Sequence, residues 1–384
     1  MDLWSDSSNC AYFYHASSLN DQLKGILHRM QVHDASIERV SFAVFDQEHS
    51  LLKTYADSSA STELAHYRAH LDDFPALARC VNEKSYRIID DLNELSPSVH
   101  VKALIDSGYR SSIAVPCFEQ DKFIGFLFVN SRKVAAFTPE LVEKMKPYFD
   151  IIQFAIFSEY QIVHAIAECA EKTQALSPSY NKDSLAHKER ISRYTRIIAN
   201  ETADMWGFDD ETIEHLCLFS RFHDIGKVNL AIDLLCKTAN LDGSETSKMR
   251  NHIESGVEIM DKIIESLGNP NHPSITLLTQ VMAYHHEFLD GSGYPFGLQG
   301  EQIPPVARVV SVANIFDALT THRPYRQAWS ITHALLEMEK MVAEGKLDKA
   351  CVNALREQKW PPIFGHDFKW SICFDSTQQY RDRL

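Results

Sequence analysis

The chain has 384 residues, 45% of them hydrophobic and 23% charged, which is typical of a globular protein with two or three domains. Its formal net charge of −14 argues against binding to polymeric nucleic acid, because such binding requires cationic side chains that neutralise phosphates. No run of about 18 apolar residues is present, so we expect no membrane span, and the acidic N-terminus does not resemble a secretory signal. The eight cysteines lack CxxC spacing, which favours a reducing, cytoplasmic location.

Residues 1–155 have the pattern of an α+β domain with an antiparallel sheet and flanking helices. Two strands are predicted within residues 39–56, around the polar turn DQEHS, and SYRIID predicts a third. Residues 113–118 and 123–129 predict a hairpin, because two apolar runs flank the polar turn EQDK. Residues 63–81, ELAHYRAHLDDFPALARCV, predict one of the flanking helices.

Three segments of this region, SSIAVPCF, FIGFLFVNS and AFTPELVEKM, resemble a GAF domain, which is a small sensor fold. The resemblance covers roughly residues 20–155. It implies a GAF-like sensor domain and identifies no ligand, because these motifs set the sheet and a helix. GAF domains bind small molecules in some proteins and only dimerise in others, so both a small effector and dimerisation alone remain open.

A long helix is predicted to connect the two parts of the chain over residues 140–176. Thr138 is a suitable N-cap, and Pro139 and Glu140 suit the first turn. Apolar residues recur for more than thirty residues, and Pro147 is expected to bend the helix without ending it. Two interpretations carry equal weight: a connector through which the chain forms a homodimer, or a core helix of one domain.

The second part of the chain, residues 160–358, is predicted to be all-helical, and histidines gather on its apolar helix faces. Ile191, Tyr194 and Ile198 are predicted to continue the inward face of His187. The helix that begins at residue 211 is predicted to end at Gly226. A single histidine on such a face is usually a packed core residue or a surface residue. Five imidazoles directed into one core would cost about 1–3 kcal/mol each if they lacked partners. A shared metal centre removes this cost, and imidazoles mixed with carboxylates suit iron, manganese or zinc. The five are His187, His223, His252, His285 and His286.

Several motifs here resemble the HD superfamily of metal-dependent phosphohydrolases. RFHDIGK contains the His-Asp doublet of that superfamily. Together with HHEFLDGSGYP and ANIFDALTTHRPYR, it resembles the HD-GYP subfamily, whose members are bacterial phosphodiesterases of cyclic di-GMP. The resemblance covers roughly residues 160–355 and implies an all-α HD-GYP domain, with a C-terminal tail over residues 359–384. The stretch from His285 to Pro295 is its most specific part, because residue types and spacing match together.

The resemblance implies a role for each matching residue. Asp224 would be the catalytic carboxylate that bridges two metal ions, and Lys227 would reach the scissile phosphate. The other implied metal ligands are His187, His223, His252, His285, His286 and Asn314, with Asp183 as a ligand of a third ion. The implied substrate contacts are Lys227, Gly293, Tyr294, Pro295, Asp317, Arg323 and Arg326. The cofactors would be two or three divalent cations, iron or manganese.

The chemistry of phosphodiester hydrolysis agrees with these residue types. Two metals about 3.5–4 Å apart hold a hydroxide at neutral pH and neutralise phosphoryl oxygens. Lys227 would stabilise the charge on the phosphoryl oxygens, and Gly291 and Gly293 would let the backbone turn beside the substrate. Glu287 is expected either to orient an imidazole or to be a charge at the helix end.

Asn314 stands where the family pattern has an aspartate ligand. An asparagine oxygen coordinates a metal without bringing charge, so a metal would bind weakly, the preferred metal would change, or the domain would be inactive. Two functions therefore stay open. One is a cyclic di-GMP phosphodiesterase that yields linear pGpG or GMP under control of the GAF-like domain. The other is a weak or inactive receptor or scaffold for a cyclic dinucleotide or a partner protein; a dinucleotide with one adenine is also open.

Overall fold

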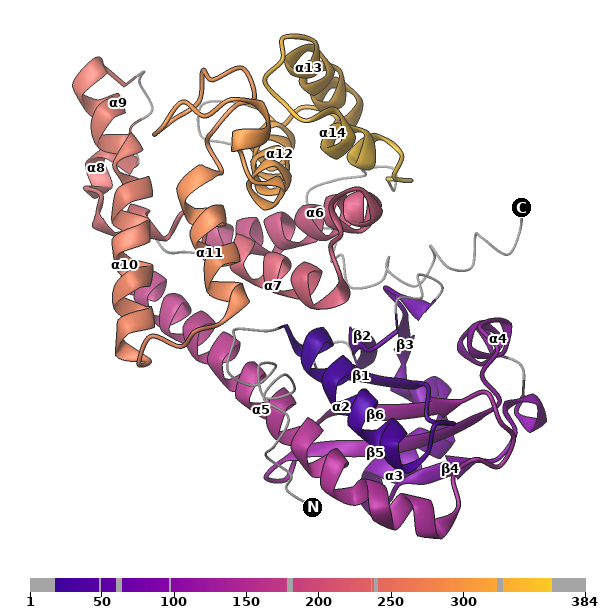
Figure 1. Ribbon diagram of the computed structural model, residues 1–384. Helices are drawn as coiled ribbons and strands as arrows, with labels where there is room; N and C mark the ends of the chain where they lie inside the picture. Colours follow the sequence, from indigo (N-terminus) through magenta and orange to yellow (C-terminus); the bar gives the residue numbers. More distant parts are fainter. Residues whose placement is uncertain are drawn as a thin grey trace.

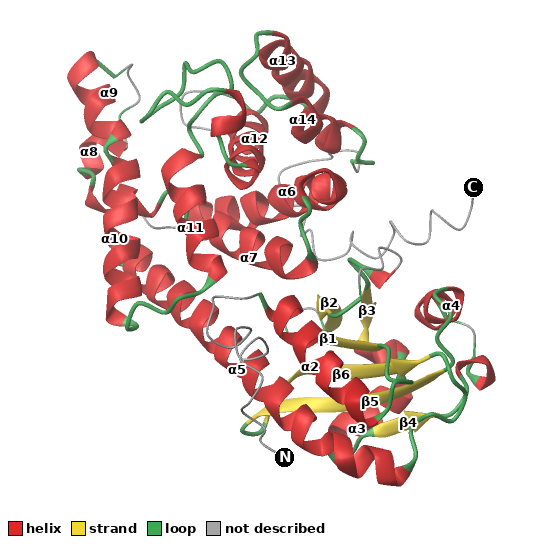
Figure 2. Cartoon of the chain, in the orientation of Figure 1, coloured by secondary structure: helices red, strands yellow, loops and turns green. Residues whose placement is uncertain are grey.

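The structure, a computed structural model, describes residues 18–47, 50–59, 64–96, 98–177, 182–235, 237, 241–322 and 327–360. A sheet-containing domain comes first, a helical domain follows, and a long helix joins them (Figure 1). Figure 2 shows that, among the described residues, the strands lie in the first domain. This arrangement confirms the predicted class, an α+β domain followed by an all-helical one. Within the described residues, no helix has the length and apolar character needed to cross a membrane.

The N-terminal domain is built on an antiparallel sheet that has six strands within the described residues. The order of its strands is β3-β2-β1-β6-β5-β4. The predicted hairpin is confirmed: β5 and β6 pair directly, and Glu119 lies opposite Lys122 at the turn. The strands are β1 (Arg39–Asp46), β2 (Leu51–Asp57), β3 (Arg68–His70), β4 (Arg87–Ile89), β5 (Ser111–Glu119) and β6 (Lys122–Ser131).

Helices cover both faces of this sheet. α2 (Leu19–His33) and the first half of α5 (Pro139–Ala175) share one apolar core with β1, β5 and β6. α3 (Pro75–Glu83) packs on the other face through Cys80, against Phe126. The short elements η2 (Leu71–Asp73), η3 (Leu92–Glu94) and α4 (Val99–Asp106) complete the domain. Burial of both faces explains the apolar content of the central strands.

The predicted helix over residues 63–81 is wrong in its first half. Residues 68–70 form β3, where Ala69 lies opposite Leu52 of β2, and α3 begins only at Pro75. Proline has no N–H and its ring clashes with the preceding turn, so it begins a helix and is disfavoured inside one. Residues 68–70 instead pair their backbone with β2, at the edge of the sheet.

α5 is a 37-residue helix, close to the predicted connecting helix. The hydroxyl of Thr138 accepts a hydrogen bond from the N–H of Leu141, which confirms the predicted N-cap, and the helix continues through Pro147. Its second half enters the core of the helical domain through residues such as Val163 and Ile166. α5 is therefore both a connector and a core helix of each domain.

The helical domain packs α7, α12 and α14 around α6. The inward face predicted for α6 is confirmed, since Ile191, Tyr194 and Ile198 are buried. The elements are α6 (Lys182–Trp206), α7 (Asp210–Ser220), η4 (Ile225–Asn229), α8 (Ile232–Leu235), α9 (Gly243–Arg250), α10 (His252–Ser266), α11 (Pro273–Tyr284), η5 (Gly300–Gln302), α12 (Pro305–Thr320), α13 (Ile331–Ala343) and α14 (Lys349–Arg356).

The helix expected to run from residue 211 to Gly226 ends earlier, at Ser220. Residues 221–224 form a turn, and Gly226 lies in η4 against the start of α10. A Cβ atom at Gly226 would lie 1.9 Å from the carbonyl oxygen of His252. The absence of a side chain at residue 226 thus lets η4 approach α10 closely, which brings Asp224 beside His252.

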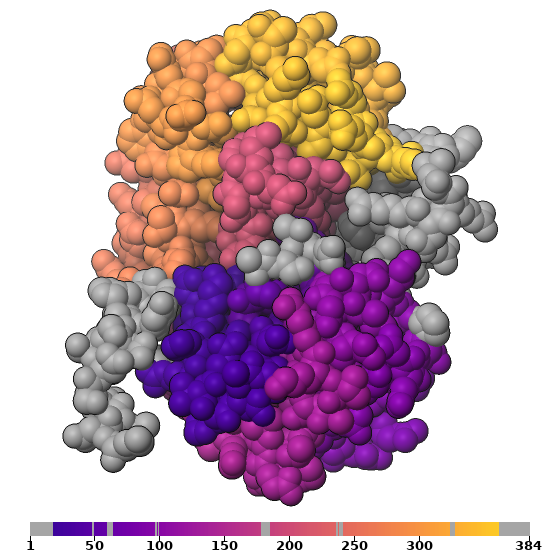
Figure 3. Space-filling view, turned by 45° about the vertical axis from the view of Figure 1, so that its right-hand side comes forward, coloured from indigo at the N-terminus to yellow at the C-terminus, as the bar shows by residue number. Residues whose placement is uncertain are grey.

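The two domains are in direct contact. Figure 3 shows the N-terminal domain, indigo to magenta, packed against the helical domain, rose to yellow. At this interface the backbone N–H of His66 donates to the carboxylate of Asp210, and the side-chain amide of Asn20 donates to Asp209 at 2.6 Å. The first turn of α7 therefore holds two separate segments of the N-terminal domain.

Candidate metal centre

Three buried histidines of the helical domain are held in the same way. Each ring donates a hydrogen bond from Nδ1 to a backbone carbonyl oxygen, which can only accept. The proton of each neutral ring is therefore on Nδ1, and the lone pair on Nε2 is free to bind a cation. The distances from Nδ1 are 2.8 Å to Ser220 for His223, 2.6 Å to Met249 for His252 and 3.0 Å to Val281 for His285.

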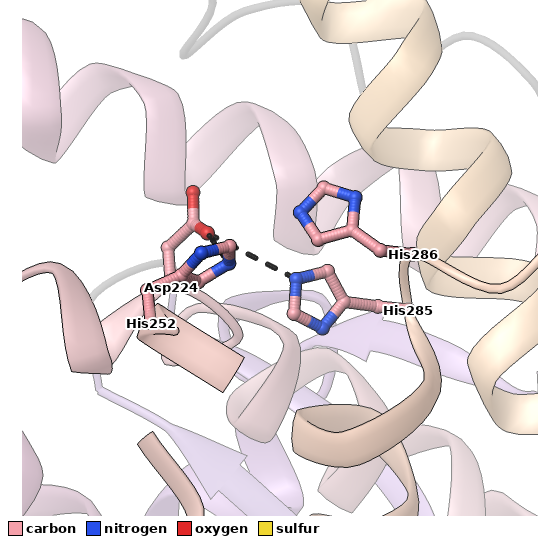
Figure 4. A group of neighbouring side chains, drawn as sticks. All are labelled: Asp224, His252, His285 and His286. Carbon is pink, nitrogen blue, oxygen red and sulfur yellow. Dashed lines mark ion pairs between the residues drawn. The ribbon is translucent and has the colours of Figure 1, made fainter. Parts of the chain in front are cut away.

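The Nε2 atoms of these histidines converge on Asp224. The Nε2 atom of His252 lies 3.2 Å from Oδ1 of Asp224, and that of His285 lies 3.9 Å from the same oxygen (Figure 4). The Nε2 atom of His223 lies 3.3 Å from the other oxygen, Oδ2. The three nitrogens and Oδ1 of Asp224 are buried without a hydrogen-bond partner among the described residues. Lone pairs facing one another in this way repel unless a cation lies between them, so the donor set fits metal ions.

Asp224 belongs to two groups of possible metal ligands. One group comprises Asp224, His252, His285 and His286, and the other comprises His187, His223 and Asp224. Within each group, one ligand atom per residue lies within 4.8 Å of the others. A carboxylate shared by two such groups is the arrangement of a bridging ligand between two metal ions.

The charges around Asp224 favour its ionised form. Burial opposes ionisation, but the ammonium group of Lys227 holds the pKa of Asp224 well below its usual range. Burial lowers the pKa of His286 to about 3 and holds that of His285 well below its usual range, so both rings stay neutral. A carboxylate beside these two neutral imidazoles can bind a cation without displacing protons from them.

Lys227 lies on the exposed side of Asp224. Its ammonium group donates a hydrogen bond to Oδ2 of Asp224 at 2.5 Å, and 37% of its side chain is exposed. A cation at this position can contact both the bridging carboxylate and an anion that approaches from solvent.

Asp317, expected to contact substrate, lies behind His187. Its Oδ2 accepts a hydrogen bond from Nδ1 of His187 at 2.7 Å, and its Oδ1 accepts one from Nε of Arg190 at 2.5 Å. Only 2% of Asp317 is exposed. It therefore orients His187 so that Nε2 is free, as the backbone carbonyls do for the other rings. Asn314 lies one turn earlier on α12 and is partly buried.

The Gly-Tyr-Pro turn is held in place by Glu287. The buried carboxylate of Glu287 accepts hydrogen bonds from the N–H groups of Phe296 at 2.7 Å and Leu298 at 3.0 Å. Neither proposed role of Glu287, orienting an imidazole or acting as a helix-end charge, describes this contact. At Gly293, a Cβ atom would lie 2.4 Å from the N atom of Phe288, so a larger residue would push the turn away.

The turn also contacts the metal-ligand cluster through Tyr294. Its ring stacks on that of His286, with centroids 4.7 Å apart and an interplanar angle of 19°. The guanidinium group of Arg250 lies 4.6 Å from the centre of the same ring. Neither Arg250 nor Arg190 was identified from the sequence, because a single arginine on a helix gives no recognisable motif.

Three expected residues cannot be placed against this cluster. Arg323 and Arg326 lie outside the described residues. Asp183 belongs to α6, but its side chain lies outside the described part of the chain. The C-terminal tail is described only as far as residue 360.

Comparison with known families concerns the helical domain. Residues 179–351 match the model of the HD domain family. The chain is 33% identical over 200 residues to the cyclic di-GMP phosphodiesterase response regulator RpfG of Xanthomonas campestris, covering 47% of this chain and 50% of the relative. It is 28% identical over 225 residues to the 3'3'-cGAMP-specific phosphodiesterase 2 of Vibrio cholerae, covering 57% of this chain and 41% of the relative. The chain thus spans about half the length of these curated relatives.

The N-terminal part has structural counterparts among GAF domains. One is the phycocyanobilin-bound GAF domain of a cyanobacterial phytochrome, with a TM-score of 0.32 and 21% identity over 41% of this chain and 93% of that one. Another is the GAF domain of an Acinetobacter phosphoenolpyruvate-protein phosphotransferase, with a TM-score of 0.32 and 15% identity. The match covers 40% of this chain and 92% of that one. The likeness concerns the fold alone.

Proposed function

We propose that this protein is a metal-dependent phosphodiesterase that hydrolyses a cyclic dinucleotide such as cyclic di-GMP. The observation that carries the proposal is Asp224, which is shared by two groups of imidazoles whose Nε2 atoms are buried without hydrogen-bond partners. Relatives matched by the HD domain are named as phosphodiesterases of cyclic di-GMP and of 3'3'-cGAMP, so either dinucleotide is a candidate substrate.

The proposed cofactors are two divalent cations, iron or manganese. His187 and His223 would hold one of them, His252, His285 and His286 would hold the other, and Asp224 would contact both. Such cations supply a nucleophile from water at neutral pH and neutralise the charge of phosphoryl oxygens. Asp183 is the proposed ligand of a third cation.

Protein groups would complete the site around the substrate. The partly exposed side chain of Lys227 places its ammonium group beside Asp224, where it can stabilise charge that develops on a phosphoryl oxygen. Tyr294 and Arg250 form an aromatic and cationic wall beside His286, suited to a base or a phosphate. Arg323 and Arg326 are proposed to bind the phosphate that does not react, because arginine forks match phosphate oxygens.

Asn314 supports an alternative function, that of a receptor or scaffold with little or no turnover. An asparagine at this position removes one negative charge from the proposed ligand set. The cation held by His187 and His223 would then bind more weakly, while the surface for the dinucleotide would be retained.

Both functions can be tested on one protein. The purified chain is reconstituted anaerobically with iron or manganese, and bound metal and turnover of cyclic di-GMP and 3'3'-cGAMP are measured. Turnover that His223→Ala abolishes would support the phosphodiesterase. Absence of turnover in the native chain, with metal content and turnover restored by Asn314→Asp, would establish the receptor. Quantifying pGpG and GMP would show whether one phosphodiester bond or both are cut.

The N-terminal domain is proposed to regulate the HD domain through α5, because α5 contributes to the core of both domains. A small effector bound to the GAF-like domain would act by changing the position of this helix. Turnover measured with the full chain and with effector candidates present tests this role.

A homodimer through α5 is also proposed. Phe154 and Ile151 are 72% and 44% exposed on the outer face of this helix, although the chain buries the apolar residues of the opposite face. We expect Phe154→Glu to convert a dimer into a monomer, measured as mass in solution at micromolar concentration. Leu336→Glu, at an exposed leucine of α13, is the control. A monomeric native chain would contradict the proposal.

A further inference from the structure

A second cluster of possible metal ligands lies where the two domains meet. It comprises Glu159 of α5 with Glu211 and His215 of α7, and one ligand atom from each lies within 4.8 Å of the others. The three residues are only 3–4% exposed: Glu159 3%, Glu211 3% and His215 4%. None of them belongs to the ligand groups around Asp224.

His272 adds a second imidazole to this cluster. Its Nε2 atom lies 3.4 Å from Oε1 of Glu159, and its Nδ1 atom lies 2.6 Å from the hydroxyl of Ser274. Both Nε2 of His272 and Oε2 of Glu159 are buried without a hydrogen-bond partner among the described residues. Unlike the rings of the metal centre, His272 accepts a hydrogen bond at Nδ1, from the N–H of Ser274 at 3.2 Å. The proton of its neutral ring is therefore on Nε2 and faces Glu159, so Oε2 of Glu159 is the buried atom that is left for a cation.

The cluster is short of positive charge. Burial raises the pKa of Glu159 to about 7, and burial together with Glu159 holds the pKa of Glu211 well above its usual range. The charged groups that act most strongly on the two carboxyl groups include Asp209 and His272, and no lysine or arginine is among them. Two buried carboxylates so close together require a cation if both are ionised.

We propose that Glu159, Glu211 and His215 bind one divalent cation at the interface between the two domains. One imidazole and two carboxylates favour a borderline cation such as Zn²⁺ or Mn²⁺ over Mg²⁺ and Ca²⁺, which prefer oxygen ligands alone. Oε1 of Glu159 lies 3.6 Å from Nε2 of His215, which leaves room for an ion between these two atoms.

The cation would fasten three parts of the chain to one another. The second oxygen of Glu211 accepts hydrogen bonds from the N–H groups of Leu19 at 2.9 Å and Asn20 at 3.4 Å, at the start of α2. The hydroxyl of Tyr55, on β2, lies 2.7 Å from Nε2 of His215 and 3.4 Å from Oε1 of Glu159. When His215 binds the cation, this hydroxyl can donate to Glu159 instead. The N-terminal domain, α5 and α7 thus meet at the site, and its occupancy sets how firmly the domains are docked.

Metal counting on the full chain tests the site. The native chain, Glu159→Gln and Glu168→Gln are each loaded with Zn²⁺ or with Mn²⁺, dialysed, and measured for bound metal per chain. We expect Glu159→Gln to lose one equivalent while the ions at Asp224 remain. Glu168→Gln, at an exposed position of the same helix, should lose none. Equal metal content in the native chain and Glu159→Gln would overturn the proposal.

Anomalous diffraction from crystals of the metal-loaded native chain gives a result that does not depend on any variant. We expect one peak between Glu159 and Glu211, separate from the peaks at Asp224. Peaks at Asp224 with none at the interface would overturn the proposal and would mean that the two carboxyl groups share a proton.

Discussion

The hydrogen bonds of individual ring nitrogens determine which histidines of this protein can bind metal. His223, His252 and His285 each give the Nδ1 proton to a backbone carbonyl, whereas His187 gives it to the carboxylate of Asp317. A carboxylate acceptor makes the imidazole a stronger base than a carbonyl does, and it fixes the same tautomer. His187 therefore gains donor strength in the group that it forms with His223 and Asp224.

Replacement of Asp317 tests this role. Asp317→Asn removes the charge that orients His187 and Arg190, so we expect metal binding to weaken by about 10–100-fold. Equilibrium titration with Mn²⁺ measures the change. Asp261→Asn, at an exposed position of α10, should bind metal like the native chain. Unchanged affinity in Asp317→Asn would show that His187 does not depend on this carboxylate.

Among the secondary-structure elements, η4 and α10 pack so closely that residue 226 cannot carry a side chain without a shift of the backbone. Gly226 lies against the backbone of His252 and Gly256, at distances that a Cβ atom cannot occupy. This contact sets the separation of Asp224 on one side from His252 on the other, and so the geometry of the shared ligand.

Replacement of Gly226 by alanine should therefore affect both stability and metal binding. We expect Gly226→Ala to lower the free energy of unfolding by roughly 1–3 kcal/mol, as overpacking does, and to reduce bound metal because Asp224 and His252 move apart. Urea unfolding and metal counting measure the two effects. Gly243→Ala is the matched control, because a Cβ atom there meets nothing within 4 Å. Equal losses in both variants would contradict the explanation.

In the whole molecule, the docking of the two domains includes a contact that depends on pH. Nδ1 of His66 in the N-terminal domain lies 2.7 Å from Oδ1 of Asp210 in α7. This hydrogen bond raises the pKa of His66, although burial acts in the opposite direction. Because the folded pKa lies above the unfolded one, the contribution to stability is full below about pH 6.5 and is lost as pH rises through the raised value.

We expect the native chain to lose stability relative to His66→Asn as pH rises from about 6 to about 8. Thermal unfolding of both proteins across this range measures the difference. Asp210→Asn should show the same flattened pH dependence, since it removes the charge while keeping an acceptor for the N–H of His66. A difference between the native chain and His66→Asn that stays constant with pH would refute the assignment.

Local patterns in the sequence were sufficient to predict much of the fold. The hairpin of β5 and β6, the cap at Thr138 and the inward face of α6 each depend on neighbouring residues, and each is found in the structure. The predictions that failed concern segments where distant contacts decide the outcome. Residues 68–70 pair with β2, and the chain after Ser220 turns to meet α10, and neither partner is visible from the local pattern.

By itself, the sequence determined which helix faces carry histidines and acids, because spacing along a helix fixes the face on which each residue lies. Only the tertiary structure decided which faces meet. It placed Asp317 behind His187, joined Glu287 to the Gly-Tyr-Pro turn, and brought Glu159 beside His272 from 113 positions away in the chain. Packing of helices and sheets sets such distances, whereas local periodicity gives only the direction of each side chain from its own element.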